Sequence, residues 1–240
     1  MTVGVYGLGR FGSFWAELLA RSIPVCGYSR AAERPTPPGV RRVGEDEVLS
    51  QSVIFFCVAI SAVEEVLGRA RTRIAPTALV MDTCSVKTYP VSLMEKLLPA
   101  STSIMGTHPM FGPDSARNGV AGQPMILCPV RISAREAEMW RELFASLGLA
   151  ISIMTPDEHD REAAFTQGVA HYIGRVLSDL GVQRSPIGTV GYKKLLEIVE
   201  QTCNDPWQLF LDLQRYNPHT REMRIRLEKS IRSIMAAIDG

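Results

Sequence analysis

The chain has 240 residues, a length that allows one large domain or two modest ones. Hydrophobic residues make up 46% of the sequence and charged residues 21%, which supports a packed core and excludes a globally disordered chain. Lys and Arg together number 26, against 25 for Asp and Glu, so the net charge gives no reason to expect nucleic acid or an anionic membrane as a partner. No apolar run is long enough to span a membrane.

The cysteine pattern and the N-terminus bear on location. Five cysteines lie far apart and none forms a CxxC pair, so the sequence gives little support to a metal site or a redox pair. The N-terminus lacks the basic start and the cleavage site of a signal peptide. Because an odd number of cysteines without an export signal is typical of reduced thiols, we expect a cytoplasmic protein without a bound metal.

Short apolar runs alternate with amphipathic stretches over residues 1–154. The runs predict strands at 2–6, 25–28, 53–59, 78–82, 103–107, 124–129 and 149–154. Helical patterns lie between several of them, notably at 11–20 and 134–147, whereas the proline-rich segment 34–39 indicates a surface loop. This alternation predicts an α/β fold with a doubly wound, mostly parallel sheet of the Rossmann type.

The pattern changes at Met154. Thr155, Pro156 and Glu158 form a capping box with proline at the first helical position, and they open a helical pattern that runs to about residue 180. Further helices are predicted at 190–203, 206–215 and 221–238. We therefore predict two domains, 1–154 and 155–240. The second is all-helical and has few residues for an independent core, so it is expected to pack on the first domain or on a second copy of itself.

A glycine-rich turn follows the first predicted strand. Its residues are Gly7, Leu8, Gly9, Arg10, Phe11 and Gly12, which give the GxGxxG spacing between a strand and a helix. The first glycine allows the tight turn, the second lets a pyrophosphate approach the backbone, and the third lets helix and strand pack closely. We predict that residues 1–154 bind a dinucleotide here; the alternative is a turn that serves packing alone.

The end of the second predicted strand indicates which nicotinamide cofactor binds. An acid there would bind the ribose 2′-hydroxyl of NAD, but the chain carries Ser29 and Arg30, with Arg34 close behind. A hydroxyl and a guanidinium suit a 2′-phosphate, so we expect NADP in preference to NAD. If both arginines are merely solvated, the choice stays open. Further cofactor contacts are expected at the ends of later strands, at Cys57, Val58, Ala59, Asp82 and Ser85.

Two predicted strand ends and one helix carry most of the chemically capable side chains. Segments 82–87 (DTCSVK) and 106–114 (GTHPMFGPD) lie at the edge of the predicted sheet where a reaction centre is expected. In the helical domain, Gln167 and His171 are four residues apart and therefore share one helix face.

These segments resemble a known family. GLGRFG, DTCSVK, GTHPMFGPDS and TPDEHDREAAFTQGVAHYIGRVL are similar to segments of the prephenate and arogenate dehydrogenases of tyrosine biosynthesis, and the likeness extends to about Leu180. HPMFGP with SVK is more specific than the glycine turn. The resemblance implies an oxidative decarboxylation: a hydride passes from C4 of a cyclohexadienol to NADP or NAD, carbon dioxide leaves C1 and the ring becomes aromatic.

The resemblance also implies roles for individual residues. His108 matches the catalytic histidine, which would accept the proton of the C4 hydroxyl, and an imidazole can be neutral at cellular pH. Ser85 matches a serine that hydrogen-bonds this histidine beside the nicotinamide. His171 matches a histidine that contacts substrate, with Gln167 on the same face and Asp114 at the pocket edge as further candidates.

Other capable side chains receive structural interpretations. Lys87 is expected to point its charge at solvent. His159 and His219 are expected to be structural or surface groups.

One position departs from the family pattern. Glu200 falls where relatives carry an arginine that binds the substrate carboxylate, and a carboxylate there would repel a dicarboxylate substrate. Lys193 and Lys194, one to two helical turns earlier, are candidate replacements, as are Arg215 or Arg221 of a second subunit. Because Glu200 would also suit an amine-bearing substrate such as arogenate, the choice between prephenate and arogenate stays open.

The last predicted helix carries apolar residues along its length, and the resemblance implies a homodimer through residues 155–240. The chain ends at Gly240, so we expect any feedback by tyrosine to act at the active site. Two other functions stay open. Another two-domain nicotinamide-dependent reductase, of the β-hydroxyacid or imine type, predicts a catalytic lysine in the helical domain, and a non-catalytic NADP-binding sensor predicts cofactor binding without turnover.

Overall fold

The computed structural model describes residues 2–240, which divide into two compact units. The first unit ends at His159 and the second is Asp160–Gly240. The division falls inside helix α6 (Pro156–Phe165), whereas the sequence pattern places the boundary before that helix, at residue 154. The first turn of α6 therefore carries His159 as part of the first unit.

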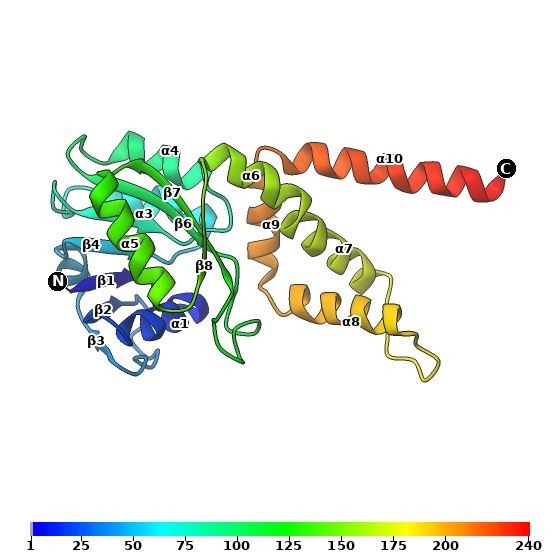
Figure 1. The fold of residues 1–240 in the computed structure, drawn as a ribbon, viewed down its shortest axis with the longest axis horizontal. Helices are drawn as coiled ribbons and strands as arrows, with labels where there is room; N and C mark the ends of the chain where they lie inside the picture. Colours follow the sequence, from blue (N-terminus) through cyan, green and yellow to red (C-terminus); the bar gives the residue numbers. More distant parts are fainter. Residues whose placement is uncertain (1) are drawn as a thin grey trace. The chain divides into compact units, whose positions relative to one another are not determined.

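The first unit is built on one eight-stranded sheet (Figure 1). Its strands are β1 (Val3–Tyr6), β2 (Val25–Tyr28), β3 (Val40–Arg42), β4 (Val53–Phe56), β5 (Leu79–Asp82), β6 (Ser103–Pro109), β7 (Pro124–Arg131) and β8 (Ala150–Ile153). They lie in the order β3-β2-β1-β4-β5-β6-β7-β8, and every neighbouring pair is parallel except β6 with β7. The prediction of a doubly wound, mostly parallel sheet is confirmed.

Helices cover both faces of this sheet. They are α1 (Arg10–Ala20), α2 (Glu45–Leu49), the short 3₁₀ turn η1 (Ile60–Ala62), α3 (Val63–Ala70), α4 (Thr88–Leu97) and α5 (Ala134–Ser146). An aromatic cluster joins α1 and α5 across β4, with the rings of Trp15 and Trp140 each 5.8 Å from that of Phe55. All three side chains are fully buried, so this face holds the largest part of the core.

The glycine and the tyrosine of β1 face the opposite side. A Cβ on Gly4 would collide with Val48 of α2, so glycine here lets α2 lie directly on the strand. Tyr6 reaches the same side, where its hydroxyl meets Glu45 of α2 and accepts a hydrogen bond from Arg69 of α3. Alternating residues of β1 thus serve two helical layers, as expected for a strand buried on both faces.

Several elements differ from the sequence-based expectation. Strand β3 and helix α2 follow the proline-rich loop and carry too many charges for an apolar pattern to reveal them. Strand β4 ends at Phe56 rather than at residue 59, and β6 extends to Pro109, so His108 lies within the strand. The predicted continuous helix from 155 breaks at Thr166, which has non-helical backbone angles and donates its hydroxyl to the carbonyl of Glu162.

The second unit consists of packed helices. After α6 come α7 (Gln167–Asp179), α8 (Val190–Cys203), α9 (Trp207–Tyr216) and α10 (Thr220–Asp239). Gly174 lets helices α7 and α8 approach closely, because a Cβ at this position would collide with Thr202. Helix α9 is tied to α7 through Gln214, whose amide donates to the carbonyl of Gly168. The predicted all-helical character of this part is confirmed.

Among the helices of residues 2–240, none has the length and apolar character needed to cross a membrane.

Candidate active site

The glycine turn after β1 forms an open cradle at the start of α1. Gly7 has φ +108°, and a Cβ there would collide with the carbonyl of Cys57. A Cβ on Gly12 would collide with the Gly7 carbonyl, so both positions require glycine for steric reasons. Around Gly9, by contrast, no atom of the described residues 2–240 comes within 4 Å of the Cβ position, apart from its chain neighbours and its own helix backbone. The backbone at the N-terminus of α1 is therefore accessible to a pyrophosphate, and the residues present fit a dinucleotide.

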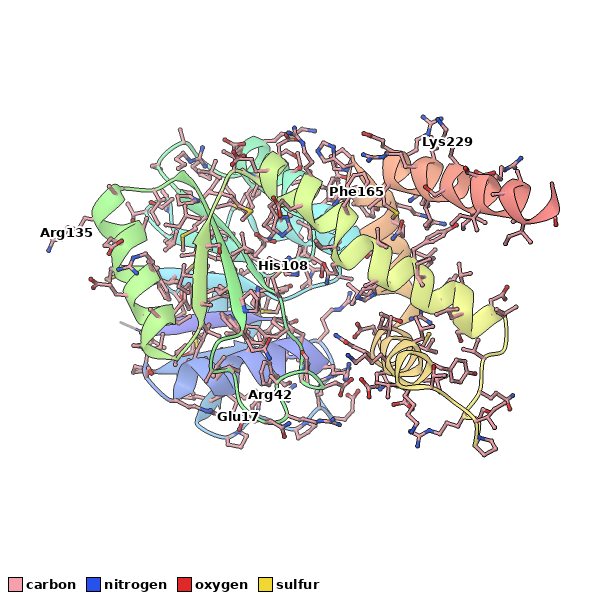
Figure 2. All side chains as sticks on the ribbon, turned by 45° about the vertical axis from the view of Figure 1, so that its right-hand side comes forward. Glu17, Arg42, His108, Arg135, Phe165 and Lys229 are labelled. Atoms are coloured by element: carbon pink, nitrogen blue, oxygen red, sulfur yellow. The ribbon has the colours of Figure 1, made fainter. Side chains whose placement is uncertain are left out.

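The loop after β2 is held by an arginine from β3. The guanidinium of Arg42, a residue labelled in Figure 2, donates to the carbonyls of Ala31 at 2.7 Å, Ser29 at 3.4 Å and Arg34. Ser29 is half-buried, and its hydroxyl accepts a hydrogen bond from the backbone of Ala31. Arg30 and Arg34 are exposed. The backbone of this loop is thus fixed while two cationic side chains remain available to a ligand.

The loop after β5 is closed by a buried ion pair. Lys87 is fully buried and donates to the Asp82 carboxylate and to the carbonyl of Thr107. Asp82 also accepts from the backbone N–H of Cys84, at 2.9 Å. One expectation is corrected here. Lys87 points inward because a carboxylate and a carbonyl compensate its desolvated charge. Asp82, 1% exposed, anchors this loop and remains a predicted cofactor contact.

This ion pair joins two strand ends. Thr107 of β6 donates its hydroxyl to the carbonyl of Asp82, so the tip of β6 is fastened to the end of β5. Ser85 lies half-buried in the loop between Asp82 and Lys87, and His108 follows Thr107 directly. The structure therefore places both predicted catalytic residues on segments that one polar network holds together.

His108, labelled in Figure 2, is 2% exposed. Its Nδ1 atom is 2.8 Å from Nε2 of His159, a hydrogen-bond distance. His159 is equally buried, which excludes the surface alternative of its sequence-based interpretation and leaves the structural one. Its contact with His108 is what sequence reasoning missed. Its position directly after the capping box is the one local signal that could have drawn attention to it.

Two further predicted residues of this unit form an ion pair with each other. Arg10, the first residue of α1, lies 2.5 Å from the carboxylate of Asp114, which follows β6. Both side chains are 46% exposed, so the pair is accessible to solvent. It links the glycine turn to the segment after His108.

The cysteines near the cradle are poor nucleophiles. Burial raises the pKa of Cys57 to about 12 and raises that of Cys84 well above its ordinary value. Both therefore stay protonated at neutral pH. Val58 and Ala59, which follow Cys57, are half-buried and exposed and remain predicted cofactor contacts.

In the second unit, one face of α7 carries three polar side chains with unsatisfied atoms. Gln167, His171 and Arg175 follow one another at intervals of four residues. Gln167 Oε1, His171 Nδ1 and Arg175 Nε are buried and have no hydrogen-bond partner among the described residues. Because such atoms are rare in folded proteins, this face is a candidate for ligand binding.

The end of α8 lies beside these residues. Arg175 donates to the carbonyls of Thr202 at 3.0 Å and Asp205 at 2.6 Å, and its guanidinium stacks on Trp207 at 5.2 Å. The Asp205 carboxylate is 4.0 Å from His171 Nε2. Burial, with a smaller effect of Arg175, lowers the pKa of His171 to about 4, so this histidine is neutral near pH 7. Sequence reasoning missed Arg175, although its four-residue spacing from His171 was visible.

The expected replacements for the family arginine lie elsewhere. Lys193 and Lys194 are exposed at the start of α8, whereas His171 faces its end. Lys193 lines a cavity of about 260 Å³ that His171 does not line. Glu200 lines the same cavity and pairs with Arg184 at 3.0 Å, so its charge is already matched. Within this unit, the prediction that these lysines serve the same ligand as His171 gains no support.

The sequence of the chain is similar to those of known proteins. The whole chain aligns with arogenate dehydrogenase 2, chloroplastic, of Arabidopsis thaliana: the two are 33% identical over 252 residues, covering 100% of this chain and 70% of that protein. The chain belongs to the arogenate and prephenate dehydrogenase family. The prediction of an NAD(P)-dependent oxidoreductase of this family, made from the residues above, is confirmed.

Other comparisons agree with this family. Residues 38–153 match the model of the prephenate dehydrogenase nucleotide-binding domain, and residues 176–240 match that of the TYRAAT1-like C-terminal domain. Arogenate dehydrogenase 1 of Arabidopsis thaliana is 32% identical over 252 residues, but the chain covers 39% of that protein's length.

A crystal structure of prephenate dehydrogenase from A. aeolicus, in complex with hydroxyphenyl propionate and NAD+, has the same fold. The likeness covers 99% of this chain and 90% of that one, with a TM-score of 0.77 and 18% identity.

Proposed function

We propose that the protein catalyses the oxidative decarboxylation of arogenate or prephenate, and that His108 is its general base. The observation that carries this proposal is His108 itself, buried at the tip of β6 with its Nδ1 engaged by His159. We propose that Nε2, the other ring nitrogen of His108, faces the substrate. The cradle at Gly7, Gly9 and Gly12, in the same unit, fits the nicotinamide cofactor, which supplies the hydride acceptor when bound.

The proton transfers follow from this arrangement. Neutral His108 accepts the proton of the C4 hydroxyl as the C4–H bond gives up its electron pair, and a carbonyl forms at C4. The bond from C1 to its carboxylate then breaks, carbon dioxide departs, and the electron pair makes the ring aromatic. The C4 oxygen takes back a proton from the imidazolium, which restores neutral His108. Ser85, on the neighbouring loop, is proposed to orient the imidazole.

For the helical unit, we propose that Gln167 and His171 hydrogen-bond the polar groups of the ring substrate. Their buried atoms without a partner support this role, and a neutral His171 can donate or accept without adding charge. Asp205, close to His171, would attract an ammonium group, which arogenate carries and prephenate lacks. We therefore propose arogenate as the preferred substrate, in line with the name of the Arabidopsis relative.

NADP is the proposed cofactor. Arg30 and Arg34 are exposed on a loop whose backbone Arg42 fixes, and the half-buried Ser29 lies beside them. Guanidinium groups bind a phosphate, whereas the 2′-hydroxyl of NAD is usually bound by a carboxylate at this position. NAD remains the weaker alternative.

A second copy of the chain is the proposed partner, through the helical unit. Helix α10 leaves large apolar side chains exposed, among them Ile231 at 47%, Ile234 at 62% and Ile238 at 77%. Ile231, Ile234 and Ile238 share a helix face, and apolar patches of this kind mark interaction surfaces.

A direct assay tests the reaction. Purified protein is incubated with NADP or NAD and with arogenate or prephenate, while absorbance of the reduced cofactor and release of carbon dioxide are followed together. We expect turnover with carbon dioxide release, fastest for arogenate with NADP. His108→Ala should lower kcat by on the order of 100-fold, as expected for loss of a general base. Cofactor binding without turnover in all four combinations would identify a sensor and reject the proposal.

A further inference from the structure

A second imidazole touches the proposed base, and the reaction scheme above leaves it without a chemical role. The rings of His108 and His159 meet at 65° with centroids 5.0 Å apart, and each side chain is 2% exposed. His108 comes from β6 and His159 from the first turn of α6, 51 residues away along the chain. The contact is therefore a product of the fold and not of local sequence.

The distance of 2.8 Å between the two nitrogens restricts the proton positions. One proton lies between Nδ1 of His108 and Nε2 of His159, because two N–H groups facing each other at this distance would repel. A base that accepts through Nε2 must carry its own proton on Nδ1, so His108 is the donor of this pair. His159 is then the acceptor, with its remaining proton on its own Nδ1.

We propose that His159 is a positioning residue for the proposed reaction: it fixes the tautomer of His108 and stabilises the imidazolium that His108 becomes. The inference rests on the proposed function of His108. In the proton-transfer step, the C4 hydroxyl proton moves to His108 Nε2, and the existing proton on Nδ1 stays shared with His159. A hydrogen bond to a charged donor is about twice as strong as a neutral one, so the contact strengthens as the charge forms.

Several other titratable groups near β6 have partners of their own. From the loop after β5, Asp82 and Lys87 pair with each other and bind Thr107 through its backbone and hydroxyl. Cys84 on the same loop has a raised pKa and stays protonated. On α6, Glu158 accepts from the backbone and hydroxyl of Thr155, in the capping box. His159 is the group whose ring nitrogen meets His108.

Two substitutions of His159 separate its acceptor function from its bulk. In His159→Gln, the side-chain amide places an oxygen near the position of Nε2 and can accept from His108. In His159→Leu, no acceptor remains. We expect kcat to fall by on the order of 10- to 100-fold in the leucine variant, the equivalent of one lost hydrogen bond to a charged group, and by much less in the glutamine variant. KM for substrate and cofactor should change little in either.

The pH profile distinguishes positioning from a structural effect. An acceptor for the protonated form raises the pKa of its donor, so its loss should shift the acidic limb of kcat/KM to lower pH in His159→Leu. Thr155→Ala is the matched control, because it removes the cap of the same helix and leaves the imidazole pair in place. Thr155→Ala should leave the acidic limb of kcat/KM at the same pH as in the wild type.

The outcomes separate the inference from the function on which it rests. If His108→Ala retains activity, the proposed base is wrong. If His108→Ala is inactive but His159→Leu matches the wild type in kcat and in the position of the acidic limb, the base stands and the role of His159 is refuted. Equal losses in the leucine and glutamine variants with an unmoved limb would likewise overturn the positioning role.

Discussion

His171 shows how burial decides what a histidine can do. His171 is 7% exposed, and desolvation lowers its pKa to about 4. Near neutral pH the ring is therefore a neutral hydrogen-bonding group and cannot supply a positive charge to bind a substrate carboxylate. The cationic group next to it is Arg175, which is engaged by the carbonyls of Thr202 and Asp205 and stacked on Trp207. Arg175 thus fixes the turn between α8 and α9, beside the face of α7 that is proposed to bind the substrate.

The depressed pKa of His171 predicts acid sensitivity. Between the ordinary histidine pKa of about 6.5 and the folded-state value of about 4, only the unfolded chain takes up the proton. The stability that His171 contributes is thus fully present above pH 6.5 and is lost as pH falls toward 4. We expect a loss of about 3 kcal/mol in the free energy of unfolding between pH 7 and pH 4, measured by urea unfolding.

Substitution isolates this contribution. His171→Leu removes the titrating group, so its stability should fall less steeply with acid than that of the wild type. His219→Leu, a control in the same unit that retains His171, should keep the loss. If the wild type and His171→Leu lose stability in parallel, the depressed pKa is not the cause.

At the scale of elements, β3 shows why charge hides a strand. Its sequence is Val40, Arg41 and Arg42, with one buried apolar residue, yet its backbone pairs in parallel with β2. The two arginines project to opposite sides, as period-two alternation requires. Arg41 pairs with Glu47 of α2 at 2.6 Å, whereas Arg42 binds the loop after β2.

This alternation supplies a matched pair of variants. We expect Arg42→Gln to raise KM for NADP by about 10-fold or more, because three carbonyls lose a charged donor and the loop that presents Arg30 and Arg34 loosens. KM for NAD should rise less, since that cofactor lacks the 2′-phosphate. Arg41→Gln, from the same strand but facing away, should change neither constant. Steady-state kinetics with each cofactor gives both KM values. Equal increases in KM for NADP and for NAD in Arg42→Gln would contradict the proposed phosphate site.

Local sequence predicts what depends on neighbours in the chain. The glycine spacing, the apolar strands and the capping box at Thr155 each act over a few residues, and the structure contains all three, although β4 and β6 end at other residues than the pattern predicts. The buried charge of Lys87 and the contact of His159 with His108 are not predicted, because their partners depend on the folded chain. A lysine is solvated unless a loop brings a carboxylate and a carbonyl to it, and no periodicity shows which strand tip a helical histidine will meet.

At the scale of the molecule, the two units differ in how completely they bury their apolar side chains. The first encloses its apolar side chains between a sheet and two helical layers. The second leaves much of α10 uncovered, because a small helical unit has too little interior to bury every apolar face. The family assignment covers the whole chain, but the open face concerns the second unit alone.

We predict that a second copy covers this face in solution. Burying one isoleucine contributes about 1.5–3 kcal/mol, so the exposed residues of α10 supply several kcal/mol to an interface. The variant Ile231→Glu with Ile234→Glu places two charges on the shared face, and size-exclusion chromatography with light scattering should show a monomer where the wild type is a dimer. Ile187→Glu is the matched control, since Ile187 is 90% exposed in the same unit but precedes α8. A wild-type chain that is monomeric at micromolar concentration, or a dimer that survives the double substitution, would show that α10 is not the dimer interface.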